Sequence, residues 1–408
     1  MIALNAFLKP PGEYLAAWRH PDGPADGGVN IAHVRALVER AERARFDAVF
    51  LADLVGVPLA DADVLSRVSV VNDSFEPTTL LAALSAVTSH IGLIATASTT
   101  YNEPYHLART FASLDHLSGG RAGWNLVTSL NDGEARNFGL DAHVPHAERY
   151  ARAEEFVDVV RGLWAGVDDG ALTRHQGHPV IVQAGASEAG KALASRVADV
   201  IFTHHGEVAA AQGFRAEIRE RARAHGRDPD HVKVLPALST ITGRTRAEAE
   251  DKAARMRELL HPRVALEDLG YWLGGVDLTP YPLDGPLPDL PLSNQSRSTQ
   301  ARVLDRARAE GLTIRQLARQ VADDDRTLVG TGTEIADHIE EFVRAGAADG
   351  FNVIFPYLPG TLEDFADLVV PELQRRGLHR TEYTGRTLRE HLGLPRPRSG
   401  YATARETP

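Results

Sequence analysis

The 408-residue sequence predicts an α/β fold: a (β/α)8 TIM barrel with an insertion before the last strand–helix unit and an extended C-terminal tail. Short apolar runs alternate along the chain with longer stretches whose apolar residues recur at helical spacing. Eight such units can be counted, and strands that alternate with helices pair in parallel. Eight parallel strands spread over a whole chain favour a closed barrel, with an open doubly wound sheet as the alternative.

The predicted elements follow from these runs in chain order. The expected strands are Ile2–Phe7, Ala48–Ala52, Ile91–Thr96, Ala122–Val127, Pro179–Gln183, Val200–Thr203, Val232–Leu238 and Phe351–Phe355. The expected helices are Ile31–Arg45, Thr78–Ser89, His106–Leu117, Glu148–Trp164, Ser187–Val197, Val208–Ala224, Arg246–Leu260, Glu334–Ala345 and Leu362–Arg376. Pro77 supports the second of these helices, because proline suits the first helical turn.

Two stretches interrupt the alternation. The segment Gly274–Ser298 is rich in proline and cannot be regular structure, whereas Thr299–Val321 has a helical pattern. We therefore expect one barrel domain over residues 1–378, with an insertion at about 262–328, followed by a tail over 379–408. The tail has little apolar content besides Leu388–Leu394, so we expect it to wrap over the surface and fray at its end.

Composition excludes several classes of protein. The formal net charge of −11, without a dense Lys/Arg cluster, argues against binding to nucleic acid or an anionic membrane surface. The absence of cysteine excludes disulfides, thiolate nucleophiles and Cys-ligated metal sites. No apolar run approaches the ~20 residues of a membrane span, and the N-terminus lacks the features of an export signal. These observations predict a cytoplasmic protein.

In a parallel barrel, functional groups come from the carboxyl ends of the strands. The residues expected there are mostly neutral hydrogen-bonding groups, which suits a pocket for a planar organic molecule better than a hydrolytic metal centre. Asp53 follows an apolar strand, where an unpaired carboxylate is costly. It can accept hydrogen bonds from a cofactor, cap a helix or pair with an arginine. The polar stretch Thr96–Thr100 either contacts a ligand or satisfies its own backbone.

A second pattern predicts a phosphate site. The segment Gly185–Gly190 follows a predicted strand and opens a predicted helix, with Ser187 placed as the N-cap. The start of a helix offers free N–H groups and the positive end of the helix dipole, and both favour an anion. Ala192 stands where a nucleotide-binding P-loop needs Ser or Thr, so a nucleoside triphosphate is disfavoured. A plain turn with a capping serine is the alternative.

His146 and Tyr150 are four residues apart and therefore share one face of a predicted helix. Together they could hold a phosphate or flank a ring, although single helical His and Tyr residues are more often ordinary surface or core groups. The other histidine pairs lack neighbouring carboxylates, so we predict no catalytic metal. The sequence contains no G-x-S-x-G elbow, which disfavours a hydrolase.

Several consecutive stretches resemble a known family, the nitrilotriacetate monooxygenase component A and dibenzothiophene sulfone monooxygenase group of the bacterial-luciferase-like flavin monooxygenases. The matching stretches are Ala16–Pro21, Phe46–Asp53, Thr96–His106, Leu114–Asn125, Val180–Gly190 and Arg380–Pro395. They span nearly the whole chain in the order of the family.

The resemblance implies a (β/α)8 barrel that uses reduced FMN (FMNH2) from a separate NAD(P)H:flavin reductase. It further implies insertion of one oxygen atom of O2 into a small organic substrate through a C4a-(hydro)peroxyflavin. Asp53, Thr96 and Thr99 would line the isoalloxazine ring, with Asn125 and Thr128 near the ring or the ribityl chain. His146, Tyr150, Ala186 and Ser187 would take the ribityl–phosphate end. For this mechanism, our own candidate for the proton donor is His146, or one of His204 and His205.

Two other functions stay open: F420-dependent hydride transfer within the same superfamily, and a flavin-binding barrel without catalysis. The family analogy also implies a homo-oligomer. The chain departs from the family between Leu172 and Gln176, where the family usually carries a longer stretch. The substrate is undetermined, and a chelate substrate would need cations such as Arg19 or Arg109 in the pocket.

Overall fold

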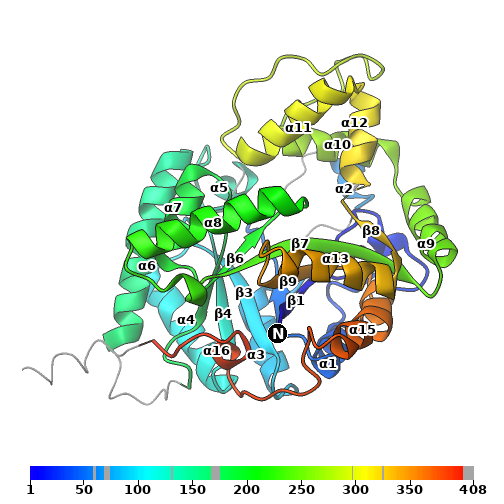
Figure 1. Cartoon of the computed structure of the whole chain (residues 1–408). Helices are drawn as coiled ribbons and strands as arrows, with labels where there is room; N and C mark the ends of the chain where they lie inside the picture. Colours follow the sequence, from blue (N-terminus) through cyan, green and yellow to red (C-terminus); the bar gives the residue numbers. More distant parts are fainter. Residues whose placement is uncertain are drawn as a thin grey trace, which may run out of the picture.

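The computed structural model describes residues 1–57, 61–68, 74–129, 132–166, 175–295, 297–323 and 326–397, and it confirms the predicted barrel. Neighbouring strands pair in parallel in the order β1-β2-β3-β4-β5-β6-β7-β9, and β9 returns to β1 (Figure 1). The barrel strands are β1 (Ala3–Leu8), β2 (Ala48–Leu51), β3 (Gly92–Ser98), β4 (Ala122–Val127), β5 (Val180–Ala184), β6 (Val200–Thr203), β7 (Lys233–Gly243) and β9 (Gly350–Ile354).

The apolar faces of most of the surrounding helices form the main core with the outer faces of the strands, whereas Val64, Ala253 and Met256 belong to two smaller apolar clusters. Helices cover the barrel on its outside. They are α1 (Ile31–Arg43), α2 (Ala62–Leu65), α3 (Pro77–Ser85), α4 (Pro104–Leu117), α5 (Asp132–Asn137), α6 (His146–Gly166), α7 (Glu188–Val197), α8 (Val208–Ala224), α9 (Arg246–Glu258), α13 (Gly332–Arg344), α14 (Gly360–Asp364) and α15 (Val370–Arg375). Local signals set their ends; α13, for example, begins with a capping box between Thr331 and Glu334. None of the described helices is long and apolar enough to cross a membrane.

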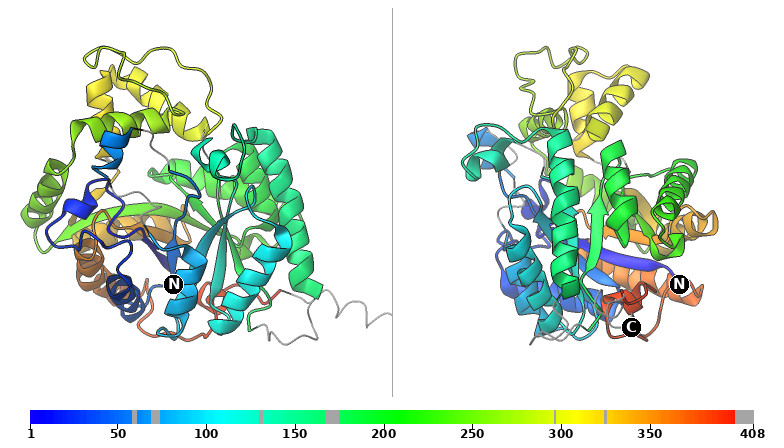
Figure 2. Two further views of the ribbon diagram at one scale, coloured as in Figure 1. Left: turned by 180° about the vertical axis from the view of Figure 1, so that it is seen from behind. Right: turned by 90° about the vertical axis from the view of Figure 1, so that its left-hand side faces the viewer.

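The insertion forms a helical lobe at one end of the barrel (Figures 1 and 2). Its helices are α10 (Pro262–Trp272), α11 (Arg297–Glu310) and α12 (Ile314–Ala322), and they share a small apolar core of their own. The helical pattern predicted over Thr299–Val321 is confirmed, and it forms two helices separated by a short break. Gly311 adopts a left-handed φ of 61° between α11 and α12, a conformation that glycine accepts and that ends a helix.

The sequence also misses a short strand, β8 (Leu328–Thr331). It pairs with the far end of β7, over Thr240–Gly243, where β7 continues beyond its predicted end. Because β8 lies outside the closed ring and is mostly half-buried, it lacks the continuous apolar run of a barrel strand.

The tail is not the surface wrap that we expected. Leu388, Leu392 and Leu394 are buried among the residues that fill the barrel interior, at the end opposite the insertion lobe (Figure 1). The short helix α16 (Leu388–His391) carries the first of them. The predicted fraying falls on residues 398–408, which lie outside the described residues.

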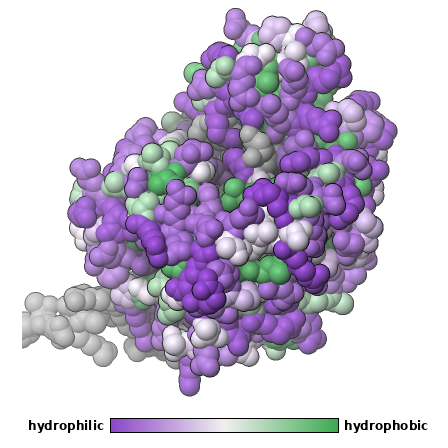
Figure 3. All heavy atoms as spheres, turned by 45° about the vertical axis from the view of Figure 1, so that its right-hand side comes forward, coloured by the Kyte–Doolittle hydropathy of each residue, from purple (hydrophilic) through white to green (hydrophobic). Residues whose placement is uncertain are grey.

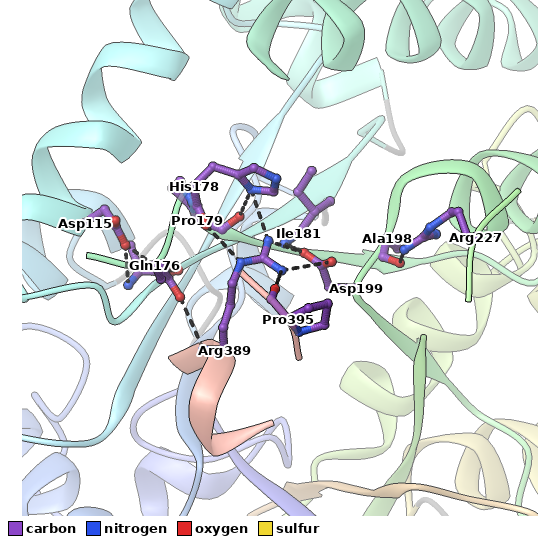
Figure 4. A network of polar contacts seen from close by, with 11 residues as sticks. Asp115, Gln176, His178, Pro179, Ile181, Ala198, Asp199, Arg227, Arg389 and Pro395 are labelled. Atoms are coloured by element: carbon purple, nitrogen blue, oxygen red, sulfur yellow. Dashed lines mark hydrogen bonds and ion pairs between the residues drawn. The ribbon is translucent and has the colours of Figure 1, made fainter. Parts of the chain in front are cut away.

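Two buried arginines fix the tail in place. Arg380 pairs with the fully buried Asp47 at 2.5 Å. Arg389 donates to Asp199 at 2.8 Å and contacts His178, and its backbone N–H reaches the side chain of Gln176 (Figure 4). Breaking a buried ion pair leaves an uncompensated charge in the core, so these pairs help to specify where the tail closes the barrel.

Candidate active site at the carboxyl ends of the strands

A hydrogen-bonded row crosses three neighbouring strands near their carboxyl ends. Thr96 on β3 donates to the Leu51 carbonyl of β2 at 2.8 Å, and Asn125 on β4 donates to the Thr96 hydroxyl at 2.9 Å. Thr96 and Asn125 are directly paired in the sheet, so their side chains lie on the same face of it. The Oδ1 atom of Asn125 is buried and has no partner among the described residues. This orphaned oxygen can accept a hydrogen bond from an N–H or O–H group of a ligand.

Asp53 lies two residues beyond Leu51, whose carbonyl ends this row. It forms no ion pair with any residue that the structure describes, so the predicted alternative of an arginine partner is not realised there. Burial, together with the nearby carboxylates Glu76 and Glu134, raises the pKa of Asp53 to about 7. This carboxyl group therefore exchanges a proton near neutral pH.

The remaining threonines are tied to the backbone. Thr99 donates to the Val127 carbonyl at 3.3 Å, and Thr100 donates to the Thr128 carbonyl at 2.8 Å. Thr99 is fully buried and Thr128 nearly so. These hydroxyls bond to the backbone at the end of the neighbouring strand β4, not to their own strand.

A tight turn between β5 and α7 makes a cradle. Ser187 accepts the N–H of Gly190 at 3.1 Å, which confirms the predicted N-cap. A Cβ atom on Gly185 would lie 2.6 Å from Nε2 of Gln183 and 3.3 Å from the Tyr150 hydroxyl, so only glycine lets these groups meet. Gln183 is buried, and its Oε1 lacks a partner within the described ranges. Ala186 is exposed at the tip of this turn.

Helix α6 brings His146 and Tyr150 to this cradle. Their ring centroids lie 4.8 Å apart, which confirms that the two residues share one helix face. Burial and the charge of Arg149 lower the pKa of His146, so the imidazole is neutral at pH 7. The turn, the Tyr150 hydroxyl and the free N–H groups at the start of α7 together form a cradle of hydrogen-bond donors that can hold a phosphate group.

Aromatic residues fill the barrel below the strand ends. Phe7 and Phe50 have ring centroids 5.1 Å apart, and Phe202 lies beside both. His204 follows β6, with its ring 4.8 Å from that of Phe202. Part of the His204 side chain is open to solvent, but the protein around its ring and two arginines nearby lower its pKa to about 3.

His205 lies on the same turn, and burial lowers its pKa as well. The three histidines named as proton donors are therefore all neutral near pH 7. Any of them would have to donate from an uncharged imidazole, which is a weak acid.

Sequence reasoning missed Arg149 and Asn294. Arg149 lies between His146 and Tyr150 in the sequence and is buried. Its place on the helix that carries these two candidate ligands could have marked it as a further candidate site residue. Asn294 lies in the proline-rich insertion, yet its Oδ1 accepts the backbone N–H of His146 at 3.1 Å. No pattern could reveal that contact, because the two residues are far apart in the chain.

The remaining expectations concern Arg19 and Arg109, a metal site and the short connection after Leu172. Arg19 donates to the Leu259 carbonyl, Arg109 is exposed, and neither joins the row at the strand ends. Within the described ranges, no group of three or more His, Asp or Glu residues could hold a metal ion. The short connection at Leu172–Arg174 lies outside the described residues.

A model of the luciferase-like monooxygenase family matches residues 12–349. The chain belongs to the luciferase-like monooxygenase family. It is 44% identical to nitrilotriacetate monooxygenase component A of Aminobacter aminovorans, over 98% of each chain. It is 43% identical to N-acetyl-S-(2-succino)cysteine monooxygenase of Bacillus subtilis, again over 98% of each chain. Relatives named as monooxygenases make this luciferase-like protein an enzyme of the oxidoreductase class.

A solved structure of riboflavin lyase with modified FMN and riboflavin is also similar to this luciferase-like chain. It has a TM-score of 0.85 and 30% identity, and the match covers 97% of this chain and 96% of that one. The EDTA monooxygenase from Chelativorans has a TM-score of 0.77 and 36% identity, over 97% of this chain and 99% of that one. These matches extend the likeness from the sequence to the whole barrel.

Proposed function

We propose that this luciferase-like monooxygenase is the oxygenase of a two-component system. It takes reduced FMN from a separate NAD(P)H:flavin reductase and inserts one oxygen atom of O2 into a small organic substrate. The observation that carries the proposal is the presence of two features at one end of the barrel: an orphaned amide oxygen on the strands, and a cradle of hydrogen-bond donors at the neighbouring turn. A planar ring with N–H groups and a phosphate tail has this polarity.

Each part of the cofactor has residues that suit it. Asn125 can accept a hydrogen bond from a ring or ribityl group, and Thr96 holds Asn125 in place. Gln183 offers a second buried acceptor at the cradle. The Tyr150 hydroxyl and the free N–H groups at the start of α7 can donate to the phosphate. When bound, reduced flavin supplies the activation of O2, so the chain itself needs no nucleophile.

The chain's own contribution is orientation and exclusion of water. Phe7, Phe50 and Phe202 close the barrel beneath the strand ends with apolar surface. The insertion lobe stands over the same end, and the face drawn in Figure 3 is hollowed between the lobe and the barrel. A site with little water would favour transfer of oxygen to the substrate over release of hydrogen peroxide.

The first test is anaerobic titration of the purified protein with reduced FMN and, separately, with reduced F420. We expect binding of FMN and none of F420. Reductase-coupled turnover under labelled O2, with nitrilotriacetate, dibenzothiophene sulfone and N-acetyl-S-(2-succino)cysteine as probes, then measures oxygen incorporation and peroxide release. Tight F420 binding with hydride transfer would replace the proposal, and FMN binding with peroxide as the only product of every probe would favour a non-catalytic barrel.

The pKa of Asp53 gives a prediction about pH. As pH rises through about 7, this carboxyl group loses its proton and adds a negative charge beside an anionic cofactor. We therefore expect FMN affinity to fall by about threefold to tenfold between pH 6 and pH 8, the range of one partly screened charge interaction. Asp53→Asn should bind FMN with nearly the same affinity at both values. If Asp53→Asn showed the same fall in FMN affinity with pH as the wild-type protein, a group other than Asp53 would be responsible for it.

A further inference from the structure

The insertion lobe contacts the barrel at the helix start that carries His146 and Tyr150. One lobe residue, Asn294, makes three hydrogen bonds there. Its Oδ1 accepts the backbone N–H of His146 at 3.1 Å, its Nδ2 donates to the His143 carbonyl at 3.4 Å, and its own carbonyl accepts Nη2 of Arg149 at 3.1 Å. The lobe is thus joined to the turn of chain that leads into the cradle.

Arg149 is a buried cation with an incomplete set of partners. Only 1% of its surface is exposed. Its Nη1 donates to the Val144 carbonyl at 2.5 Å, and its Nε has no partner among the described residues. The acceptors of its two hydrogen bonds are main-chain carbonyls, which are neutral, and nearby Glu134 raises its pKa less than burial lowers it. Arg121 is also buried with neutral acceptors, but its donors are all satisfied, whereas the Nε of Arg149 is free to donate to an anion.

Arg297 adds a second positive charge from the lobe. It is the first residue of α11, three positions after Asn294, and it forms no ion pair within the described parts of the chain. Its charge lowers the pKa of both His146 and Arg149, as expected of a cation close to both. Arg297 is exposed, and it lies close to His146 on the part of the lobe that Asn294 joins to the barrel by hydrogen bonds.

We propose that the phosphate of the bound flavin docks the insertion lobe onto the barrel by balancing Arg149 and Arg297, with Asn294 as the link between lobe and cradle. The inference rests on the proposed function, because it needs a phosphorylated cofactor. Arg149, Asn294 and Arg297 act as positioning residues. Coupling of this kind is reciprocal: phosphate strengthens lobe docking, and a docked lobe strengthens phosphate binding by the same factor.

The test compares FMN with riboflavin, which has the same ring system and lacks the phosphate. Hydrogen exchange is followed in α10–α12 of the full-length protein with each ligand at saturation. We expect FMN to slow exchange in the lobe at least about fivefold more than riboflavin, the lower end of ordinary coupling. Asn294→Ala and Arg297→Met should remove most of this difference and weaken FMN binding by a similar factor, with riboflavin affinity unchanged.

Arg308→Met is the matched control, because Arg308 is an exposed arginine on the same helix whose ion pair with Asp305 is long, at 3.9 Å. It should keep the difference between FMN and riboflavin. Equal lobe protection by the two ligands, in a protein that binds FMN more tightly than riboflavin, would overturn the inference and leave the proposed function standing. Failure of the wild-type protein to bind FMN in either redox state would overturn both.

Discussion

Replacing Arg380 with leucine is expected to lower the free energy of unfolding by about 3–5 kcal/mol at pH 8. Arg380 is the ion-pair partner of Asp47, which is fully buried immediately before β2, and it also donates to the His391 carbonyl in the tail. Without the guanidinium, the carboxylate stays in the core with the backbone N–H of Leu4 as a neutral partner. Chemical unfolding monitored by circular dichroism measures the change.

The pH dependence separates this effect from simple loss of packing. Burial raises the pKa of Asp47 to about 6, above its ordinary value of 3.8, even with Arg380 present. The folded protein therefore holds this proton more tightly than the unfolded chain, and the resulting stabilisation is lost as pH rises from about 3.8 to about 6. Removing Arg380 raises the pKa of Asp47 further. The destabilisation should accordingly be smaller at pH 5 than at pH 8.

Two variants control this prediction. Asp47→Asn combined with Arg380→Leu should recover part of the lost stability, because a neutral amide has no charge to bury and can still accept the Leu4 N–H. Arg40→Leu removes the half-buried partner of the exposed Asp367 and should cost less than about 1 kcal/mol. If the double variant were no more stable than Arg380→Leu alone, packing and not charge would explain the loss.

The barrel was predictable because its strands are buried on both faces. Runs such as Val200–Thr203 and Phe351–Phe355 are continuous and apolar, and helical stretches separate them, so their existence and pairing follow from pattern alone. Strand β8 and the break at Gly311 were not predictable in this way. Their structure depends on a neighbouring strand and on a single left-handed glycine, and neither feature changes the apolar periodicity.

The position of the C-terminal tail could not be predicted, for a different reason. Its sequence contains few apolar residues, and that composition predicts an exposed segment. The structure buries it through Arg380 and Arg389, whose carboxylate partners Asp47 and Asp199 come from distant parts of the chain. A single sequence gives no indication that these two arginines and two aspartates form pairs.

The candidate site also has some features that local sequence predicts and others that depend on tertiary packing. The Ser187 cap and the His146–Tyr150 pair depend on residues within about one turn of helix, so spacing was sufficient to predict them. The approach of Tyr150 to Gly185 and the contact of Asn294 with His146 depend on tertiary packing. Fixed local offsets predict the parts of the cradle, and the fold assembles them.

The second large effect is expected at the cradle itself. The combined Tyr150→Phe and Ser187→Ala variant should bind FMN about 100-fold more weakly than the wild-type protein. Each substitution removes a hydroxyl that can donate to the phosphate, and hydrogen bonds to a charged group contribute about 1.5 kcal/mol or more each. Fluorescence quenching of FMN on titration with protein measures the change.

The affinity of the double variant for riboflavin, which lacks the phosphate, shows which part of FMN has lost its contacts. A cradle that holds the phosphate predicts that the double variant binds riboflavin nearly as well as the wild-type protein does, so the preference for FMN collapses. Ser187 also caps α7, and losing that cap costs about 1 kcal/mol of stability, which thermal unfolding reports separately. Tyr105→Phe with Ser113→Ala repeats both chemical changes on α4 and should leave binding unchanged. If the double variant weakened riboflavin binding as much as FMN binding, the phosphate would not lie at this turn, and the proposed placement of the cofactor would be wrong.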